Sequence, residues 1–173
     1  MDTPDVLLRA ARFQVVRKTQ ITPDGKTHDR EIVRHPGSVV LLPLLEDGRV
    51  VLIRNYRVAV EQWLVELPAG TLDPGEDPSL AAHRELAEET GYRAGSLELL
   101  CRFYPSPGIL DEQMHLFLAT GLEAGPASLE GGEQIEPCLV AWQEALEMAR
   151  DGRIQDAKTL TGLLYYELLR RRT

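Results

Sequence analysis

The sequence predicts an α+β fold in one domain. Three observations support this class: a length of 173 residues, strand-like segments on both sides of an amphipathic helix, and Gly and Pro clusters that separate only short segments. A chain of this size can bury roughly 70% of the surface that it exposes when unfolded. We therefore expect a complete hydrophobic core.

Short apolar or alternating segments bounded by turn residues predict the strands. Residues 11–20 and 30–34 flank the turn formers of TPDGK and predict a leading hairpin. Six further strands are expected at residues 38–44, 49–56, 63–66, 97–103, 114–120 and 135–141.

Three segments predict helices. Asp77 and Pro78 are typical of an N-cap and a first helical position, and Gly91 is typical of a residue that ends a helix. These signals predict a helix over residues 78–90. Two further helical patterns cover about residues 143–150 and 157–171.

Composition excludes several classes of protein. With 19 Lys and Arg against 27 Asp and Glu, the net charge of −8 disfavours a large nucleic-acid-binding surface. Asp2 and Asp5 stand where a signal peptide carries positive charge, and no apolar stretch approaches 18 residues, so no membrane association is expected. Cys101 and Cys138 lie in apolar runs and are interpreted as buried thiols. These features favour a cytoplasmic protein.

An acidic face distinguishes the first predicted helix. At about 100° per residue, Glu85, Glu88 and Glu89 share this face. Like charges at these spacings destabilise a helix by a few tenths of a kcal/mol per pair. The spacing leaves two interpretations open, a solvated acidic surface or a site for hard divalent cations. The opposite face carries the residues expected to pack inside the protein: Leu80, His83, Leu86, Ala87 and Thr90.

A longer motif distinguishes these interpretations. Nine positions over 23 residues match the Nudix box: Gly70, Glu76, Arg84, Glu85, Leu86, Glu88, Glu89, Gly91 and Tyr92. The chain therefore resembles the Nudix hydrolase superfamily. The resemblance implies an α/β/α sandwich around a mixed sheet, with an N-terminal β-hairpin region. It also implies hydrolysis of a nucleoside diphosphate linked to another group.

The flanking segments resemble the ADP-ribose pyrophosphatase branch of that superfamily. Pro107 lies 15 residues beyond Tyr92, where this branch carries a proline. The other matching segments are residues 34–38, 52–57, 66–70, 106–108 and 155–159. The resemblance implies a metal-dependent enzyme that converts ADP-ribose to AMP and ribose 5-phosphate.

Three alternatives remain open. GDP-mannose or another nucleoside diphosphate sugar is one, because the GDP-mannose branch shares the Ser-Pro-Gly loop and the tail. A non-catalytic nucleotide-binding Nudix module would be expected to lack a box carboxylate, and this chain has all of them. Cleavage of capped RNA or dinucleoside polyphosphates would predict basic channels, which the net charge disfavours.

The resemblance implies a set of metal ligands. These are the side chains of Glu85 and Glu89 and the backbone carbonyl of Ala69, and Glu88 joins a second cation. Glu133, in the loop before the last strand, is expected to reach the metal and to act as general base. A solvated carboxylate is the alternative for Glu133. Mg²⁺ is the expected ion, with Mn²⁺ or Zn²⁺ possible.

Arg84 completes the expected catalytic set with Glu133 and Glu88. Because it lies four residues before Glu88, we expect Arg84 to orient the carboxylates and not to touch substrate. A simple charge offset is the alternative for Arg84.

Other residues are expected to bind the substrate. The resemblance implies that Arg57 contacts the diphosphate and that Glu112, just after the Ser-Pro-Gly loop, contacts the terminal ribose side. Gly108, in that loop, is a further substrate-binding candidate. Arg54 is a further candidate, although Arg54 and Arg57 should point to different faces of their strand, and a surface salt bridge is the alternative. Trp63 is expected in the core or at a dimer contact.

The chain divides into two regions. Residues 1–36 form an N-terminal strand region, which the resemblance places at a homodimer interface, and residues 37–173 form the Nudix hydrolase domain. A short hairpin is marginal in isolation, so packing against a second chain is expected. The alternative is a hairpin that covers its own sheet. The expected ligand is a small nucleoside diphosphate sugar.

Overall fold

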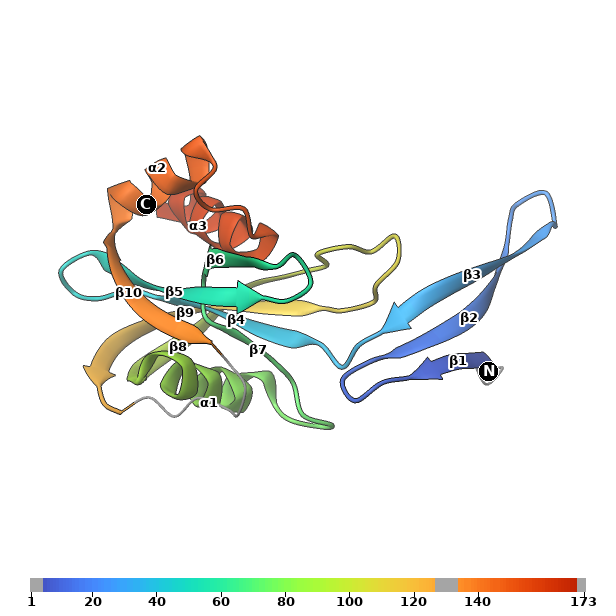
Figure 1. The fold of residues 1–173 in the computed structure, drawn as a ribbon, viewed down its shortest axis with the longest axis horizontal. Helices are drawn as coiled ribbons and strands as arrows, with labels where there is room; N and C mark the ends of the chain where they lie inside the picture. The colour runs from blue at the N-terminus through green and yellow to red at the C-terminus, as the bar shows by residue number, and fades with distance from the viewer. Residues whose placement is uncertain (1–4, 127–133, 171–173) are drawn as a thin grey trace.

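The computed structural model describes residues 5–126 and 134–170. It contains a projecting N-terminal sheet and a body of two sheets between helices (Figure 1). The strands of the N-terminal sheet are β1 Asp5–Arg9, β2 Gln14–Ile21 and β3 Thr27–Arg34. The strands of the body, in sheet order, are β7 Ala69–Thr71, β4 Ser38–Pro43, β9 Met114–Ala124 and β8 Tyr92–Phe103, then β10 Ile135–Ala141, β5 Arg49–Arg57 and β6 Gln62–Glu66. The helices are α1 Pro78–Thr90, α2 Trp142–Asp151 and α3 Ala157–Arg170.

The predicted leading hairpin is part of a larger antiparallel sheet. β2 and β3 form the hairpin, and β1 adds a third strand through pairs such as Val6 with Val16. β1 was not predicted because its apolar run is short. The sheet extends away from the body (Figure 1).

The loop at residues 106–112 connects the N-terminal sheet to the body. Val33 N–H donates to the Ile109 carbonyl at 2.8 Å, and Asp111 N–H donates to the Val33 carbonyl at 3.1 Å. His35 N–H donates to the Asp111 carboxylate at 2.8 Å. These bonds hold the last residues of β3 and the start of β4 beside the loop.

The body has the expected α/β/α layers. β4 and β9 are parallel, the other strand pairs are antiparallel, and the four-stranded sheet is therefore mixed. α1 lies on one side of the sheets, and α2 and α3 lie on the other (Figure 1). One core cluster contains Trp142 and Leu163 of α2 and α3, and a second contains Ala82 and Leu86 of α1. The α+β class is confirmed.

The sequence prediction missed the first half of β8 and the whole of β7. β8 begins at Tyr92, five residues before the expected start, because its first half carries polar and glycine residues without an apolar alternation. β7 was not predicted at all. It is only three residues long and is fixed by pairing with β4, as in Ser38 with Thr71.

Capping residues at both ends explain where α1 begins and ends. The Asp77 carboxylate accepts the Ser79 N–H at 2.8 Å, and Gly91, with φ of 75°, ends the helix by donating its N–H to the Ala87 carbonyl. The expected packing of Leu80 and His83 was wrong, because Leu80 is 65% exposed and His83 is exposed. Compared with the expected orientation, α1 is turned about its axis, and the residues that it buries are Ala81, Ala82, Leu86, Glu89 and Thr90.

Two smaller predictions can also be compared with the structure. Cys101 and Cys138 are free thiols, but they are half-buried and not fully buried, and burial raises the pKa of each. Trp63 is 40% exposed and packs edge-on against Tyr56, so it does not lie in the core, and its alternative, a dimer contact, stays a prediction. In the part of the chain that the structure describes, no helix is long and apolar enough to cross a membrane.

Candidate active site

A cleft of about 840 Å³ lies where the N-terminal sheet meets the body. Its wall is formed by seven parts of the chain: residues 10–14, 34–38, 55–57, 69–74 and 111–114, the α1 residues Arg84, Glu85 and Glu89, and Lys158 at the start of α3. The cleft therefore collects charged side chains that are far apart in the sequence.

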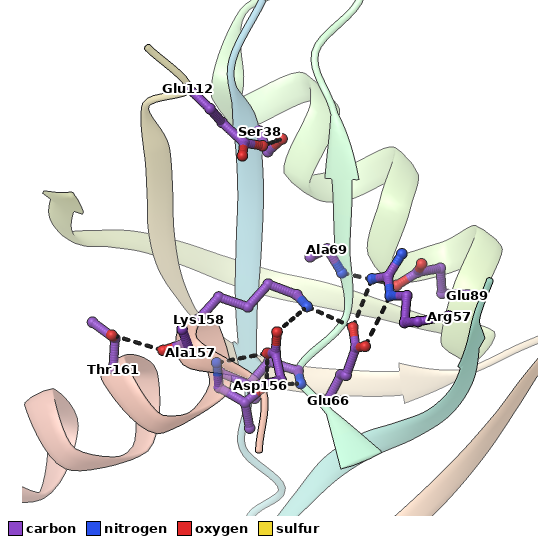
Figure 2. Close-up of polar contacts among 12 residues, drawn as sticks. Ser38, Arg57, Glu66, Ala69, Glu89, Glu112, Asp156, Ala157, Lys158 and Thr161 are labelled. Atoms are coloured by element: carbon purple, nitrogen blue, oxygen red, sulfur yellow. Dashed lines mark hydrogen bonds and ion pairs between the residues drawn. The ribbon is translucent and has the colours of Figure 1, made fainter. Parts of the chain in front are cut away.

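Glu85 and Glu89 form the acidic part of the wall. Glu89 is only 3% exposed, and its carboxylate accepts the Ala69 N–H at 2.9 Å (Figure 2). Gly70 gives Glu85 its space, because a Cβ at position 70 would lie 1.8 Å from the carboxylate carbon of Glu85. The box glycine thus allows the β7 backbone to approach α1 closely.

Arg84 connects four acceptors around α1. Its Nε and Nη2 donate to the two carboxylate oxygens of Glu76 at 3.1 and 3.0 Å. Its Nη1 donates to Glu85 at 2.7 Å and to Glu88 at 3.1 Å. Arg84 lowers the pKa of Glu76, and Glu76 is the main cause of the raised pKa of Arg84. The contact with Glu88 was expected, whereas the role of Glu76 was not assigned from the sequence.

The donor set fits a hard divalent cation. Glu85, Glu88 and Glu89 offer carboxylate oxygens from one helix, which is the chemistry that Mg²⁺ prefers. Among the described residues, no three His, Cys, Asp or Glu side chains already converge on one point. The reason is visible in the contacts, since Glu85 and Glu88 turn toward Arg84 and Glu89 turns toward Ala69.

Arg57 and Lys158 form a basic part of the cleft wall. Both donate to Glu66, and Lys158 also donates to Asp156 at 2.9 Å (Figure 2). The hydrogen bond to Glu66 is the main cause that raises the pKa of Arg57. Arg57 is thus a permanent cation inside the cleft.

Arg54 is not brought into the cleft. It pairs with Glu136 at 3.2 Å, and its guanidinium lies 5.3 Å from the ring centroid of Trp63. Both partners lie outside the described cleft wall, so within this chain Arg54 makes the surface ion pair that was its alternative.

Glu112 lies in the cleft beside β4. It accepts the Ser38 hydroxyl at 2.5 Å (Figure 2). The same oxygen is 3.5 Å from Nδ1 of His35. That nitrogen accepts the Gly37 N–H at 3.2 Å. Gly108 lies on the same loop as Glu112 but does not line the cleft.

The expected general base, Glu133, lies outside the described residues. Its role stays a prediction.

The cleft residues that the sequence analysis did not assign to the site include Arg12, Phe13, Ser38 and Lys158. Lys158 belongs to the tail segment 155–159, so the tail pattern could have identified it. Arg12 and Phe13 carried no local signal, because their position depends on how the N-terminal sheet meets the body.

Comparison with known proteins identifies the family. The NUDIX domain model matches residues 33–163. The chain belongs to the Nudix family, and it is a Nudix hydrolase.

Particular relatives are similar over most of the chain. A methanol dehydrogenase activator of Bacillus methanolicus is 41% identical, and an ADP-ribose pyrophosphatase of Bacillus subtilis is 40% identical, each over 84% of this chain and 80% of its own. A GDP-mannose pyrophosphatase of Cronobacter sakazakii is 40% identical over 86% of both chains.

A solved structure supports the fold. The crystal structure of an ADP compounds hydrolase matches 99% of this chain and 97% of its own, with a TM-score of 0.81 and 23% identity. The Nudix fold expected from the sequence is therefore confirmed.

Proposed function

We propose that this protein is a magnesium-dependent pyrophosphatase that hydrolyses ADP-ribose to AMP and ribose 5-phosphate. The observation that carries the proposal is one cleft of about 840 Å³ that contains the box carboxylates Glu85 and Glu89 together with the cations Arg57 and Lys158. Carboxylates that hold a dication and cations that hold phosphate oxygens are the two requirements for cleaving a diphosphate.

The ligand set for the metal is Glu85, Glu88, Glu89 and the carbonyl of Ala69, joined by Glu133. Bound Mg²⁺ neutralises charge on the phosphate oxygens and lowers the pKa of a coordinated water. Mn²⁺ or Zn²⁺ is the alternative ion. Arg84 orients Glu85 and Glu88 through the hydrogen bonds described above.

Proton transfer is assigned to Glu133, which accepts a proton from the attacking water. Arg57 binds the diphosphate, since its guanidinium lines the cleft and forks suit phosphate oxygens.

Two residues of the cleft wall suit the two ends of ADP-ribose. Phe13 lies on the cleft wall and is 39% exposed, so its ring offers a flat apolar surface for a nucleobase. Glu112 offers a carboxylate that can accept hydrogen bonds from ribose hydroxyls. Similarity to the Bacillus subtilis ADP-ribose pyrophosphatase supports ADP-ribose, and so adenosine, as the group that this cleft binds. GDP-mannose is the second candidate substrate, because the chain is equally similar to a GDP-mannose pyrophosphatase.

The N-terminal region, residues 1–36, is proposed to lie at a homodimer interface. The support is the projection of the N-terminal sheet from the body (Figure 1). The apolar side chains of Leu7, Leu8 and Ile21 are also exposed. The protein is proposed to act in the cytoplasm on a small nucleoside diphosphate sugar.

A substrate panel tests this function. ADP-ribose, GDP-mannose, NADH and diadenosine polyphosphates are incubated with the protein and Mg²⁺, and monophosphate release is measured by chromatography. We expect AMP from ADP-ribose with the highest kcat/KM, and no product when EDTA is present. A higher kcat/KM for GDP-mannose would move the assignment to that sugar. Binding without any turnover would indicate a non-catalytic module.

A further inference from the structure

Glu66 is a buried carboxylate that holds two cations of the cleft (Figure 2). One of its oxygens accepts Arg57 Nε at 2.8 Å, and the other accepts Arg57 Nη2 at 2.6 Å and Lys158 Nζ at 2.5 Å. The Glu66 side chain is only 1% exposed. A charge this deeply buried persists only when its partners are fixed around it.

The two cations come from different elements. Arg57 is the last residue of β5, Lys158 lies in the first turn of α3, and Glu66 is the last residue of β6. Asp156 fixes the helix end, because its Oδ1 lies 2.9 Å from Lys158 Nζ and its Oδ2 accepts both the N–H and the hydroxyl of Thr159. Glu66 therefore joins a strand and a helix at one point of the cleft wall.

Both cations retain hydrogen-bond donors. Arg57 has five N–H donors, of which two bind Glu66, and Lys158 has three, of which two bind Glu66 and Asp156. Because both residues line the cleft, the remaining donors are available to an anion there. The Arg57 guanidinium and the Lys158 ammonium are bound to the same carboxylate, so both are already in position when an anion enters the cleft.

We propose that Glu66 is a positioning residue that fixes Arg57 and Lys158 as a paired binding site for the diphosphate of the substrate. The inference rests on the proposed function, because it takes a nucleoside diphosphate as the ligand. Prearranged cations lose little side-chain freedom when an anion binds, so their full attraction contributes to affinity.

The variant Glu66→Gln distinguishes a positioning role of Glu66 from a purely electrostatic one, because the two roles predict opposite changes in anion affinity. Glu66→Gln removes a negative charge beside the anion site, so electrostatic attraction alone would strengthen anion binding. The Gln amide nitrogen is a donor, so it cannot accept the N–H groups that one oxygen of Glu66 accepts. Positioning therefore predicts weaker anion binding although both cations remain.

The experiment is calorimetry with two ligands that differ only in the diphosphate. α,β-Methylene-ADP carries a diphosphate whose bridge cannot be hydrolysed, and adenosine carries none. With Mg²⁺ present, Glu66→Gln and Lys158→Met should each weaken α,β-methylene-ADP binding about tenfold and leave the adenosine Kd unchanged. Arg153→Met is the matched control for Lys158→Met, because it removes an exposed cation outside the cleft and should change neither Kd.

Equal or tighter α,β-methylene-ADP binding in Glu66→Gln would overturn the inference, as would an equal loss of adenosine binding. If circular dichroism shows that Glu66→Gln does not fold, Lys158→Met decides, and an unchanged Kd overturns the inference. Turnover of ADP-ribose by the native protein tests the proposed function separately. A native chain that hydrolyses ADP-ribose while both variants bind normally would refute the paired site alone.

Discussion

The absence of a side chain at Gly70 leaves the space in which the Glu85 carboxylate lies. The hydrogen in place of a side chain lets β7 pass beside α1, and any Cβ would occupy the position of that carboxylate. Such close approach is a common reason for a glycine at a ligand site. The box pattern identified both residues from the sequence, but the physical connection between them needed the fold.

Gly70→Ala should reduce metal-dependent turnover without unfolding the protein. The three atoms nearest to the new methyl group all belong to the end of the Glu85 side chain, which can swing away, so we expect a loss of about 10–100-fold in apparent Mg²⁺ affinity. Turnover measured across a Mg²⁺ titration checks this. The double variant Gly70→Ala/Glu85→Gln should be no worse than Glu85→Gln, because both changes remove the same ligand. Additive losses would contradict this explanation.

Glu89→Gln should lower kcat by at least about a hundredfold while the melting temperature changes little. The Gln carbonyl can still accept the Ala69 N–H, so this buried hydrogen bond is kept while the negative charge is lost. Enzyme assay and thermal melting are the measurements. Glu98→Gln, a similar change at an exposed position on β8, is the control and should retain full activity. Near-native activity of Glu89→Gln at saturating Mg²⁺ would refute the metal assignment.

The element α1 was predictable because its signals are local. Asp77, Pro78 and Gly91 fix both ends within a few residues, and the structure confirms the range. β7 and the cleft wall were not predictable in this way. Lys158 and Glu66 meet across 92 residues of sequence, and residues 10–14 reach the cleft only because the N-terminal sheet docks on one loop. Such contacts depend on tertiary packing, which a local pattern does not contain.

The N-cap of α1 should contribute measurably to stability. Asp77→Ala removes the acceptor of the Ser79 N–H and should lower the free energy of unfolding by about 1 kcal/mol, as measured by urea denaturation. Asp77→Asn is the matched control, because its carbonyl can accept the same bond and should lose much less. Equal losses in both variants would show that charge, and not capping, is responsible.

Charge is distributed unevenly over the whole molecule. Residues 1–36 contain seven Lys and Arg against five Asp and Glu, whereas the remaining residues contain twelve against twenty-two. A basic projecting sheet and an acidic body are electrostatically complementary, so two copies of the chain can attract each other through these regions.

Deleting residues 1–35 should therefore abolish dimerisation and ADP-ribose binding together. The deletion removes the proposed interface and also the cleft wall at residues 10–14 and at Arg34 and His35. Sedimentation velocity and calorimetry are the measurements. Raising the salt concentration should weaken the dimer of the full chain, since screening acts on exposed charges. A truncated chain that is monomeric, folded and fully active would show that the N-terminal region has no part in the site.

Under the proposed function, the tip between β1 and β2 would contact the substrate without taking part in the packing of the body. Residues 10–14 supply part of the cleft wall but belong to neither core cluster, so replacing them leaves the packing of the body intact. Mutations at such exposed loop positions are tolerated more readily than mutations in a core. Under the proposed function, changes at these five consecutive residues would alter substrate preference while α1 and its carboxylates stay unchanged. A mutant library confined to this tip would explore substrate range at little risk to folding.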